Sequence, residues 1–116
     1  MRFELAEDVV FNSPILRKPV LGADDVRIAL SNAMAVLGDR EFLPPVIDGN
    51  RLLSLWSCTV SGVSIDAATV IRAGENHHVK ELTVFVRPWP AFQLFRDRMI
   101  ARVGHLIDES YYALSE

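Results

Sequence analysis

Glu81 is one of two carboxylates in this sequence that stand where acid or base chemistry would need them. It lies in the segment KELTVFVRPWPAF, residues 80–92, in which Glu81, Thr83, Phe85 and Arg87 alternate with apolar side chains. Alternation with period two is typical of a strand with two different faces. If the row of Glu81 faces a cavity, the apolar wall raises the carboxyl pKa and fits the group to proton transfer. The plainer interpretation places Glu81 on an outer face, paired with a lysine or arginine.

Asp66 is the second candidate acid or base. It lies three residues before Thr69 in the segment IDAATVIR. Because strand side chains alternate between faces, this odd separation puts Asp66 and Thr69 on opposite faces unless a bulge intervenes. A solvated carboxylate near a hairpin is the plainer interpretation of Asp66. Arg87, at the end of the last strand, is a candidate for holding an anionic ligand, although such an arginine commonly extends to solvent or caps carbonyl groups.

Aromatic side chains supply material for an apolar ligand site. Small-molecule sites combine apolar and aromatic walls with a few polar groups. The alternative is that these aromatics are simply core, as aromatics at strand and helix spacing usually are. The predicted ligand-pocket residues are Phe11, Trp56, Thr69, Phe85, Arg87 and Trp89, with Phe92 and Phe95 as further aromatic candidates.

Metal and nucleophile chemistry have little basis in the sequence. His77 and His78 are adjacent beside a turn, and adjacent strand side chains point to opposite faces, so the pair is poorly placed to share one metal. Cys58, in the segment WSCTV, indicates a small buried residue of a strand rather than a nucleophile. We therefore expect no metal site and no cofactor.

Size, charge and hydropathy limit the class of protein. With 116 residues, half of them hydrophobic, the chain is the size of one domain, 1–116. Twelve basic and fifteen acidic residues give a net charge of −3 without a basic face interleaved with aromatics, so we expect no nucleic-acid role. No apolar run approaches the roughly 18 residues of a membrane span, and no signal-peptide pattern is present. We expect no membrane role and a cytoplasmic location.

Hydrophobic periodicity predicts the elements that must position these residues. Residues 22–25 open a predicted helix whose apolar stripe, at helical spacing, runs from Val26 to Leu37, and Gly38 is well placed to cap its end. The stretch 41–47 contains Pro44 and Pro45, so its strand is expected at a sheet edge or bulged. Strands are expected over residues 8–12, 41–47, 52–60, 63–71 and 79–87, with hairpin links between the last four.

The last strand ends where prolines interrupt its pattern. Pro88 and Pro90 cannot donate backbone hydrogen bonds, and Pro90 suits the first turn of a helix that continues through Phe92, Phe95 and Met99. The order strand, helix, four strands, helix predicts an α+β fold with an antiparallel sheet and helices on one side.

Three segments in register resemble the SnoaL-like branch of the nuclear transport factor 2 superfamily. They are AEDVVFNSP at residues 6–14, the helical segment 22–36, and VKELTVFVRP at residues 79–88. The resemblance implies a curved sheet that wraps around helices as a cone with a pocket at its open end. The wider superfamily includes ketosteroid isomerase, scytalone dehydratase, limonene epoxide hydrolase, polyketide cyclases, and binding or assembly modules, so the fold alone does not select a function.

The sequence departs from this family pattern in two places. Most relatives carry a long helix before the first strand, and here only residues 1–7 precede it, so we expect that helix to be shortened or absent. Thr69 stands where many relatives place an aspartate that points into the cavity, and a hydroxyl is a poor general base at neutral pH. Residues 107–116 are expected to form a tail or a dimer arm.

Three functions remain open from the sequence. The first is a homodimeric pocket protein that binds a small apolar or amphipathic metabolite. The second is an isomerase, cyclase or hydrolase that uses Glu81 or Asp66 as general acid or base. The third is a purely structural or assembly module, which follows if the protein's own side chains fill the cone. Apolar residues on both faces of residues 82–86 indicate that neither face is left in water, which favours a homodimer.

Overall fold

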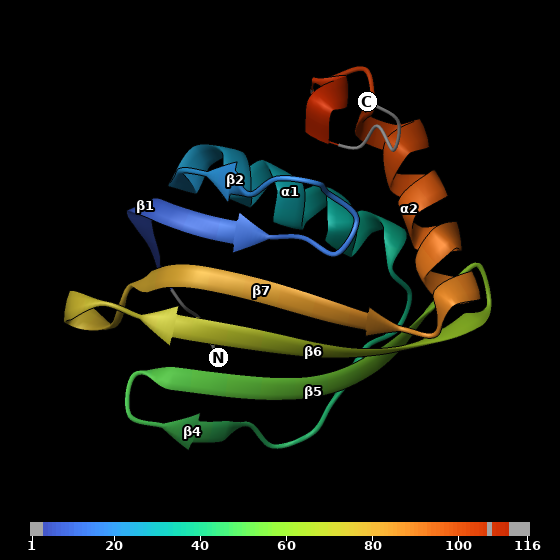
Figure 1. Cartoon of the computed structure of the whole chain (residues 1–116). Helices are drawn as coiled ribbons and strands as arrows, with labels where there is room; N and C mark the ends of the chain where they lie inside the picture. Colours follow the sequence, from blue (N-terminus) through green and yellow to red (C-terminus); the bar gives the residue numbers. More distant parts are fainter. Residues whose placement is uncertain (1–3, 107, 112–116) are drawn as a thin grey trace.

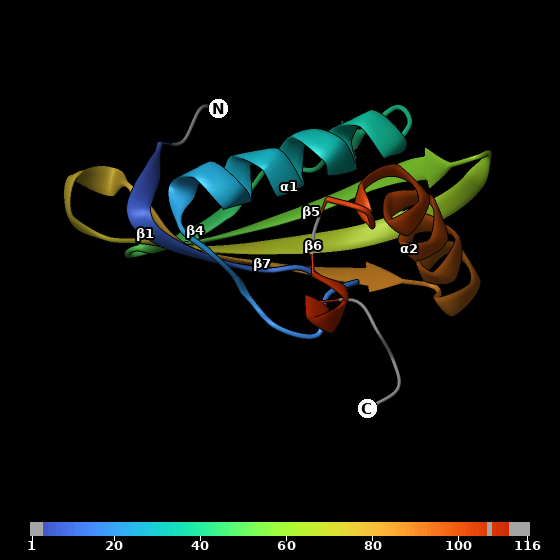
Figure 2. The ribbon, with the colours of Figure 1, turned by 90° about the horizontal axis from the view of Figure 1, so that it is seen from above.

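One curved sheet carries the molecule, with both long helices on the same side of it (Figures 1 and 2). The computed structural model describes residues 4–106 and 108–111. The strands are β1 (Leu5–Asn12), β2 (Val20–Leu21), β3 (Glu41–Phe42), β4 (Val46–Asp48), β5 (Arg51–Val60), β6 (Val63–Ala73) and β7 (Val79–Arg87). The helices are α1 (Ala23–Val36) and α2 (Trp89–Val103), with short 3₁₀ turns at Glu75–His77 and Glu109–Tyr111. The α+β fold predicted from the sequence is confirmed.

β1 and β7, the first and last strands in the sequence, lie side by side in the sheet. The strand order is β2-β1-β7-β6-β5-β3, and β4 also pairs with β5. The pair β1–β7 is parallel and the other described pairs are antiparallel, so the sheet is mixed rather than wholly antiparallel. The hairpin pattern of the later strands predicts their antiparallel pairing, but it carries no information about where β1 joins them.

The proline pair at 44–45 and the Ser61-Gly62 pair end strands where the sequence predicts. The predicted strand 41–47 divides into β3 and β4 around Pro44 and Pro45, which lack the backbone N–H that a ladder needs. It lies at the edge of the sheet, as predicted. The turn between β5 and β6 is the tight two-residue one, in which Ser61 and Gly62 both have positive φ, 47° and 81°.

Gly38 has a different role from the predicted helix cap. The residue at the C-cap of α1 is Leu37, whose backbone N–H donates to the Ala33 carbonyl oxygen. The Gly38 N–H instead donates to the Thr59 carbonyl oxygen at 2.7 Å, which ties the end of α1 to β5. A Cβ at Gly38 would lie 2.5 Å from Thr59 Oγ1. The glycine is therefore required for a close approach of two backbones rather than for a left-handed cap.

Helix α2 follows β7 at the predicted prolines. Pro88 occupies the N-cap position with an extended backbone, and Pro90 lies in the first turn. The helix buries Ala91, Phe95 and Met99, of which Phe95 and Met99 were predicted to lie on it. They pack in one core cluster with Cys58, Val60 and Ile65 of β5 and β6.

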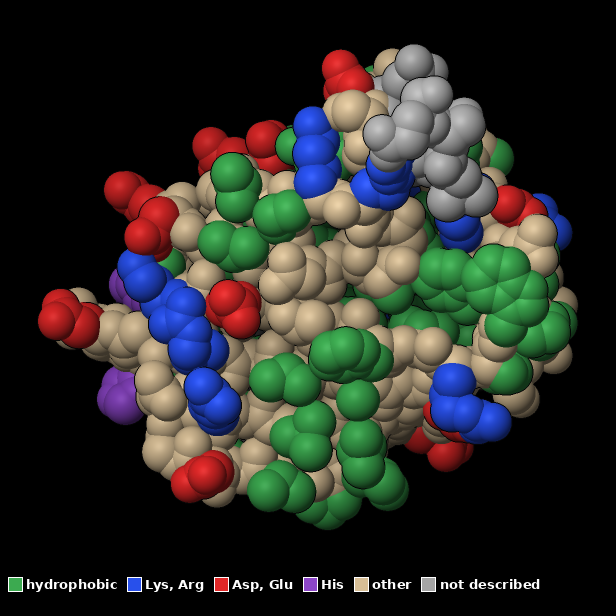
Figure 3. All heavy atoms as spheres, viewed as in Figure 1, with side chains coloured by type: hydrophobic (Ala, Val, Ile, Leu, Met, Phe, Trp, Pro, Cys, Tyr) green, Lys and Arg blue, Asp and Glu red, His purple; other side chains and the backbone are tan. Residues whose placement is uncertain are grey.

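Burial distinguishes the two faces of the sheet. Side chains of α1 and α2 pack on the face that carries Cys58, Ile65 and Leu82, which we call the helix-facing side. The opposite side, which we call the outer face, carries the alternate residues of β5, β6 and β7. It leaves Leu53, Leu55 and Phe85 substantially exposed, with Val46 of β4 beside them. Figure 3 shows hydrophobic side chains gathered over these strands.

The described part of the C-terminal segment folds back on the chain. The Arg17 N–H donates to the Tyr111 carbonyl oxygen at 2.6 Å, and Lys18 Nζ lies 4.3 Å from the centre of the Tyr111 ring. Tyr111 also packs against the core cluster of β1 and α1. Residues 107 and 112–116 of the predicted tail or dimer arm lie outside the described residues.

Candidate functional site

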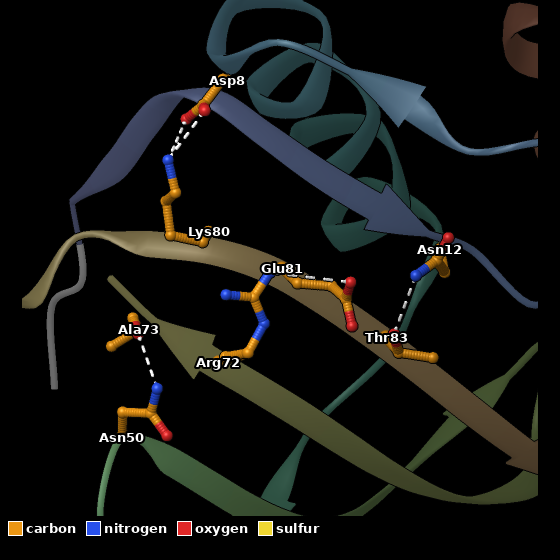
Figure 4. Close-up of polar contacts among 8 residues, drawn as sticks. All are labelled: Asp8, Asn12, Asn50, Arg72, Ala73, Lys80, Glu81 and Thr83. Carbon is orange, nitrogen blue, oxygen red and sulfur yellow. Dashed lines mark hydrogen bonds and ion pairs between the residues drawn. The ribbon is translucent and has the colours of Figure 1, made fainter. Parts of the chain in front are cut away.

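Glu81 lies on the outer face, paired with an arginine. Its row, shared with Thr83, Phe85 and Arg87 as predicted, is opposite the buried Leu82. Glu81 Oε2 lies 3.9 Å from Arg72 NH2 on β6, and the two side chains are 44% and 42% exposed. Figure 4 shows the two side chains pointing toward one another, with Lys80 and Asp8 nearby. The row therefore faces away from the helices. Glu81 lies on an outer face beside an arginine, which matches the plainer interpretation of the sequence.

Asp66 lies on the same outer face, toward the other end of the sheet. It pairs with Arg87 across β6 and β7, and Arg87 NH1 donates to Asp66 Oδ2 at 2.7 Å. Thr69 lies on the helix-facing side, because the register between β5 and β6 is continuous and the parity argument holds. A role as acid or base remains a prediction for both Glu81 and Asp66, and neither lines the hollow between β1, β7 and α2 or the hollow at the start of α1.

Trp56 and Thr69 form a polar contact on the helix-facing side. Trp56 Nε1 donates to Thr69 Oγ1 at 2.9 Å, and Phe42 stacks on the Trp56 ring with centroids 5.9 Å apart. Trp56 also packs against the core cluster of α2. Phe11 is itself core, 5% exposed among Val9, Val26 and Leu82. Three predicted pocket residues, Phe11, Trp56 and Thr69, thus contribute to packing or hydrogen bonding on the helix-facing side.

The other three predicted pocket residues meet at a groove. It has a volume of about 540 Å³ and lies between the turn after β1, the end of β7 and the start of α2. We call it the β7–α2 groove. Its lining residues are Asn12, Ser13, Pro14, Thr83, Val84, Phe85, Val86, Arg87, Trp89 and Phe92.

The groove exists because β1 ends before β7 does. The parallel pairing reaches Asn12 and Thr83 and stops, whereas β7 continues to Arg87. Asn12 Nδ2 donates to Thr83 Oγ1 at 3.0 Å at this last pair, which Figure 4 shows at the tip of β1. Beyond it Ser13 and Pro14 turn the chain away, which leaves the edge of β7 beside a hollow.

Aromatic rings dominate the chemistry of the β7–α2 groove. Trp89 and Phe92 make a tilted pair with centroids 5.5 Å apart, and Trp89 and Phe85 are each more than half exposed. Arg87 is the one charged side chain among the lining residues, which include no carboxylate. The polar members Asn12, Ser13 and Thr83 come from the turn and the last β1–β7 pair. Walls of this kind suit a flat apolar body with a polar end.

Sequence reasoning missed the side of the groove that belongs to residues 12–14. The motif FNSP correctly signals a strand followed by a turn. What it lacks is any indication that this turn lies beside β7, about seventy residues further along the chain, because that depends on the parallel pairing of β1 with β7.

Solved structures share this architecture over most of the chain. A bacterial protein with a cystatin-like fold from Silicibacter pomeroyi is 27% identical, with a TM-score of 0.83 over 86% of this chain and 71% of that one. A steroid delta-isomerase from Pseudomonas aeruginosa is 26% identical, with a TM-score of 0.82 over 87% of this chain and 75% of that one. Further matches include proteins described as similar to nuclear transport factor 2. The chain has the cystatin-like, nuclear transport factor 2-like fold.

The likeness of this chain to the SnoaL-like branch is one of fold. A protein from a Jannaschia species assigned as a SnoaL-like polyketide cyclase matches with a TM-score of 0.67 at 9% identity, over 80% of this chain and 74% of that one. Comparison of the sequence with protein-family models gives no match, and comparison with curated proteins gives none.

The helix-facing side of the sheet holds neutral polar groups at its centre. Steroid isomerisation needs a carboxylate base and a proton-donating partner beside an apolar cavity. Thr69 lies opposite Ser54 on the neighbouring strand and accepts its hydrogen bond from Trp56. Glu81 and Asp66 lie on the other face, so neither of the two predicted carboxylates reaches this centre.

Metal ligands and nucleophiles do not gather in the described part of the chain. No group of three or more His, Cys, Asp or Glu residues there could hold a metal ion. His78 Nε2 lies 3.5 Å from Glu4 Oε2, away from the β7–α2 groove. Cys58 is a buried free cysteine, and burial raises the pKa of its thiol, which disfavours the nucleophilic thiolate. Among the described helices none is long and apolar enough to cross a membrane.

Proposed function

We propose that this protein binds a small apolar or amphipathic molecule in the β7–α2 groove. The observation that carries the proposal is the exposure of Phe85 and Trp89 beside a hollow of about 540 Å³. Ligand sites typically have volumes of this order and mostly apolar walls. Each 100 Å² of apolar surface that a ligand covers contributes about 2.5 kcal/mol before the costs of binding are subtracted.

A titration with an aromatic probe tests the proposal. We expect 2-naphthoic acid to shift the Trp89 indole resonance in a ¹⁵N-edited NMR titration, and Trp89→Ala to abolish saturable binding. Ile28→Ala is the matched control, because Ile28 is an exposed apolar residue of α1 that does not line the groove. Binding that survives Trp89→Ala, or saturates with shifts centred on Trp56 and Thr69, would place the ligand elsewhere and refute the assignment of the groove.

An enzymatic role is the second candidate, and the likeness to a steroid delta-isomerase favours it. Of the two predicted acid or base residues, Asp66 is the better placed, because it contacts Arg87 at the rim of the groove. Glu81 faces Arg72 instead. An isomerase, cyclase or hydrolase of this kind would lose turnover in Asp66→Asn while its ligand affinity stayed within a few-fold of the native value. Retention of full turnover in Asp66→Asn and in Glu81→Gln would exclude both residues from the chemistry.

A homodimer through the outer face is our proposal for the assembly of this protein. Leu53 lies between Val46 and Val70 in the strand pairing, and Leu55 lies opposite Ala68, so these side chains form an apolar patch on β4, β5 and β6, away from the groove. Exposed apolar surfaces of this extent commonly mark contacts with partners.

Analytical ultracentrifugation tests this assembly. We expect a dimer that Leu55→Lys converts to a monomer, whereas Leu106→Lys, at an exposed leucine away from the sheet, leaves it unchanged. A native protein that sediments as a monomer at millimolar concentration would refute the dimer. A dimer that binds no ligand would favour the purely structural role.

A further inference from the structure

We infer that the ligand of the β7–α2 groove carries a carboxylate, which Arg87 binds while Asp66 competes for the same guanidinium. The inference rests on the proposed function and specifies the ligand class. The groove has aromatic walls and one cation among its lining residues, with no acidic side chain there. Its charge therefore complements an anion attached to an apolar body.

Arg87 has hydrogen-bonding capacity to spare. A guanidinium presents five N–H donors in a planar fork. Among the described residues, Arg87 has one polar partner, Asp66 Oδ2, which NH1 contacts at 2.7 Å. The side chain is 73% exposed, so its remaining donors are open to a second carboxylate. Arginine suits this task because its planar fork matches the two oxygens of a carboxylate.

Asp66 holds the arginine in place and also opposes the ligand. It lies directly across from Arg87 in the β6–β7 pairing, on the strand that is further from the groove. A carboxylate that enters from the groove approaches Arg87 from the β7 side, so the guanidinium is shared between two anions. The charge of Asp66 repels the incoming anion and satisfies part of the arginine, which lowers the affinity of the site for acids.

Matched acid and neutral probes test this inference. We expect 2-naphthoic acid to bind about three- to fivefold more tightly than 2-naphthamide at low ionic strength, a modest preference because an exposed ion pair is screened. Arg87→Met should remove the preference by weakening the acid alone. Asp66→Asn should strengthen binding of the acid about threefold and leave the amide unchanged, because it removes a competing charge.

The chain offers a matched pair of control variants. Arg27 NH1 and Asp24 Oδ1 lie 3.2 Å apart on α1, and both side chains are mostly exposed. Arg27→Met and Asp24→Asn make the same charge changes away from the groove and should leave both affinities unchanged. Circular dichroism and thermal unfolding of each variant confirm that it is folded, and Asp66→Asn alone decides the question if Arg87→Met does not fold.

The outcomes separate the inference from the proposed function. Equal affinity for acid and amide in the native protein would overturn the carboxylate while leaving the apolar site intact. Weaker binding of the acid to Asp66→Asn would overturn the competition between Asp66 and the ligand. If neither probe binds and Trp89 does not respond, the proposed function fails and the inference fails with it.

Discussion

Removal of the hydrogen bond between Trp56 and Thr69 tests whether the helix-facing side is a structural interior or a ligand site. Both side chains are half-buried, and the donor-to-acceptor distance is 2.9 Å. A hydrogen bond of this kind contributes about 1 kcal/mol net, because the unfolded chain exchanges it for water. For a chain of 116 residues, 1 kcal/mol corresponds to about 4 °C in Tm.

A double-mutant cycle isolates this contact. Trp56→Phe also loses packing against Phe42 and the α2 core cluster, so we expect it to cost about 2 to 3 kcal/mol. Thr69→Val should cost about 1 kcal/mol, and the double variant should be about 1 kcal/mol more stable than the sum of the single changes predicts. Urea denaturation followed by circular dichroism gives the four stabilities.

Two results would refute this reasoning about Trp56 and Thr69. A coupling energy below about 0.3 kcal/mol would mean that the contact does not contribute to the native state. A loss of 2-naphthoic acid binding in folded Thr69→Val would mean that the hydroxyl contacts ligand, and the site would then lie between the sheet and the helices rather than at the β7–α2 groove.

Three further predictions concern close packing, the buried thiol and an exposed ion pair. Gly38→Ala should lower the free energy of unfolding by about 1 to 3 kcal/mol in urea denaturation, because the new Cβ meets Thr59, and Thr59→Ala should recover part of the loss. No loss would mean that the backbones separate easily. Cys58 should react with a thiol reagent at pH 8 only at the rate of unfolding, because burial raises its pKa, and rapid labelling of the folded protein would contradict this. The hydrogen bond from Lys80 lowers the pKa of Asp8, so its stabilising contribution is present above about pH 4 and is lost as the pH falls through the folded-state pKa. Native protein and Asp8→Asn should therefore differ in Tm at pH 7 and converge as the pH falls below the folded-state pKa of Asp8, whereas a constant difference would contradict the linkage.

The sequence predicted the elements of the fold better than it predicted the orientation of the sheet. Period-two alternation in residues 79–87 correctly grouped Glu81 with Phe85 and Arg87, and parity correctly separated Asp66 from Thr69. Alternation alone does not say which row meets the helices. Both rows of β7 contain large apolar side chains, and the choice between them depends on where α1 and α2 pack.

The candidate site could be predicted only in part for a similar reason. Phe85, Arg87 and Trp89 lie within five residues, so their proximity follows from the local chain. The opposite wall, residues 12–14, is brought there by the parallel pairing of β1 with β7. Such a pairing joins segments far apart in sequence, and no local pattern encodes it. Gly38 was misassigned because a glycine after a helix usually indicates a cap, whereas here it permits contact with Thr59.

The position of β7 between β1 and β6 determines the order in which the chain can fold. During synthesis β1 emerges first, yet its only long partner strand among the described residues begins at Val79. Until then β1 and β2 have no sheet to join, while β5 and β6 can already close their hairpin. When β7 forms, it joins β1 and β2 to the hairpin of β5 and β6. Such long-range pairing slows folding, and strand edges stay unpaired until it is complete. The edge of β1 that pairs with β7 therefore stays without its partner strand in a nascent chain until residues 79–87 have left the ribosome.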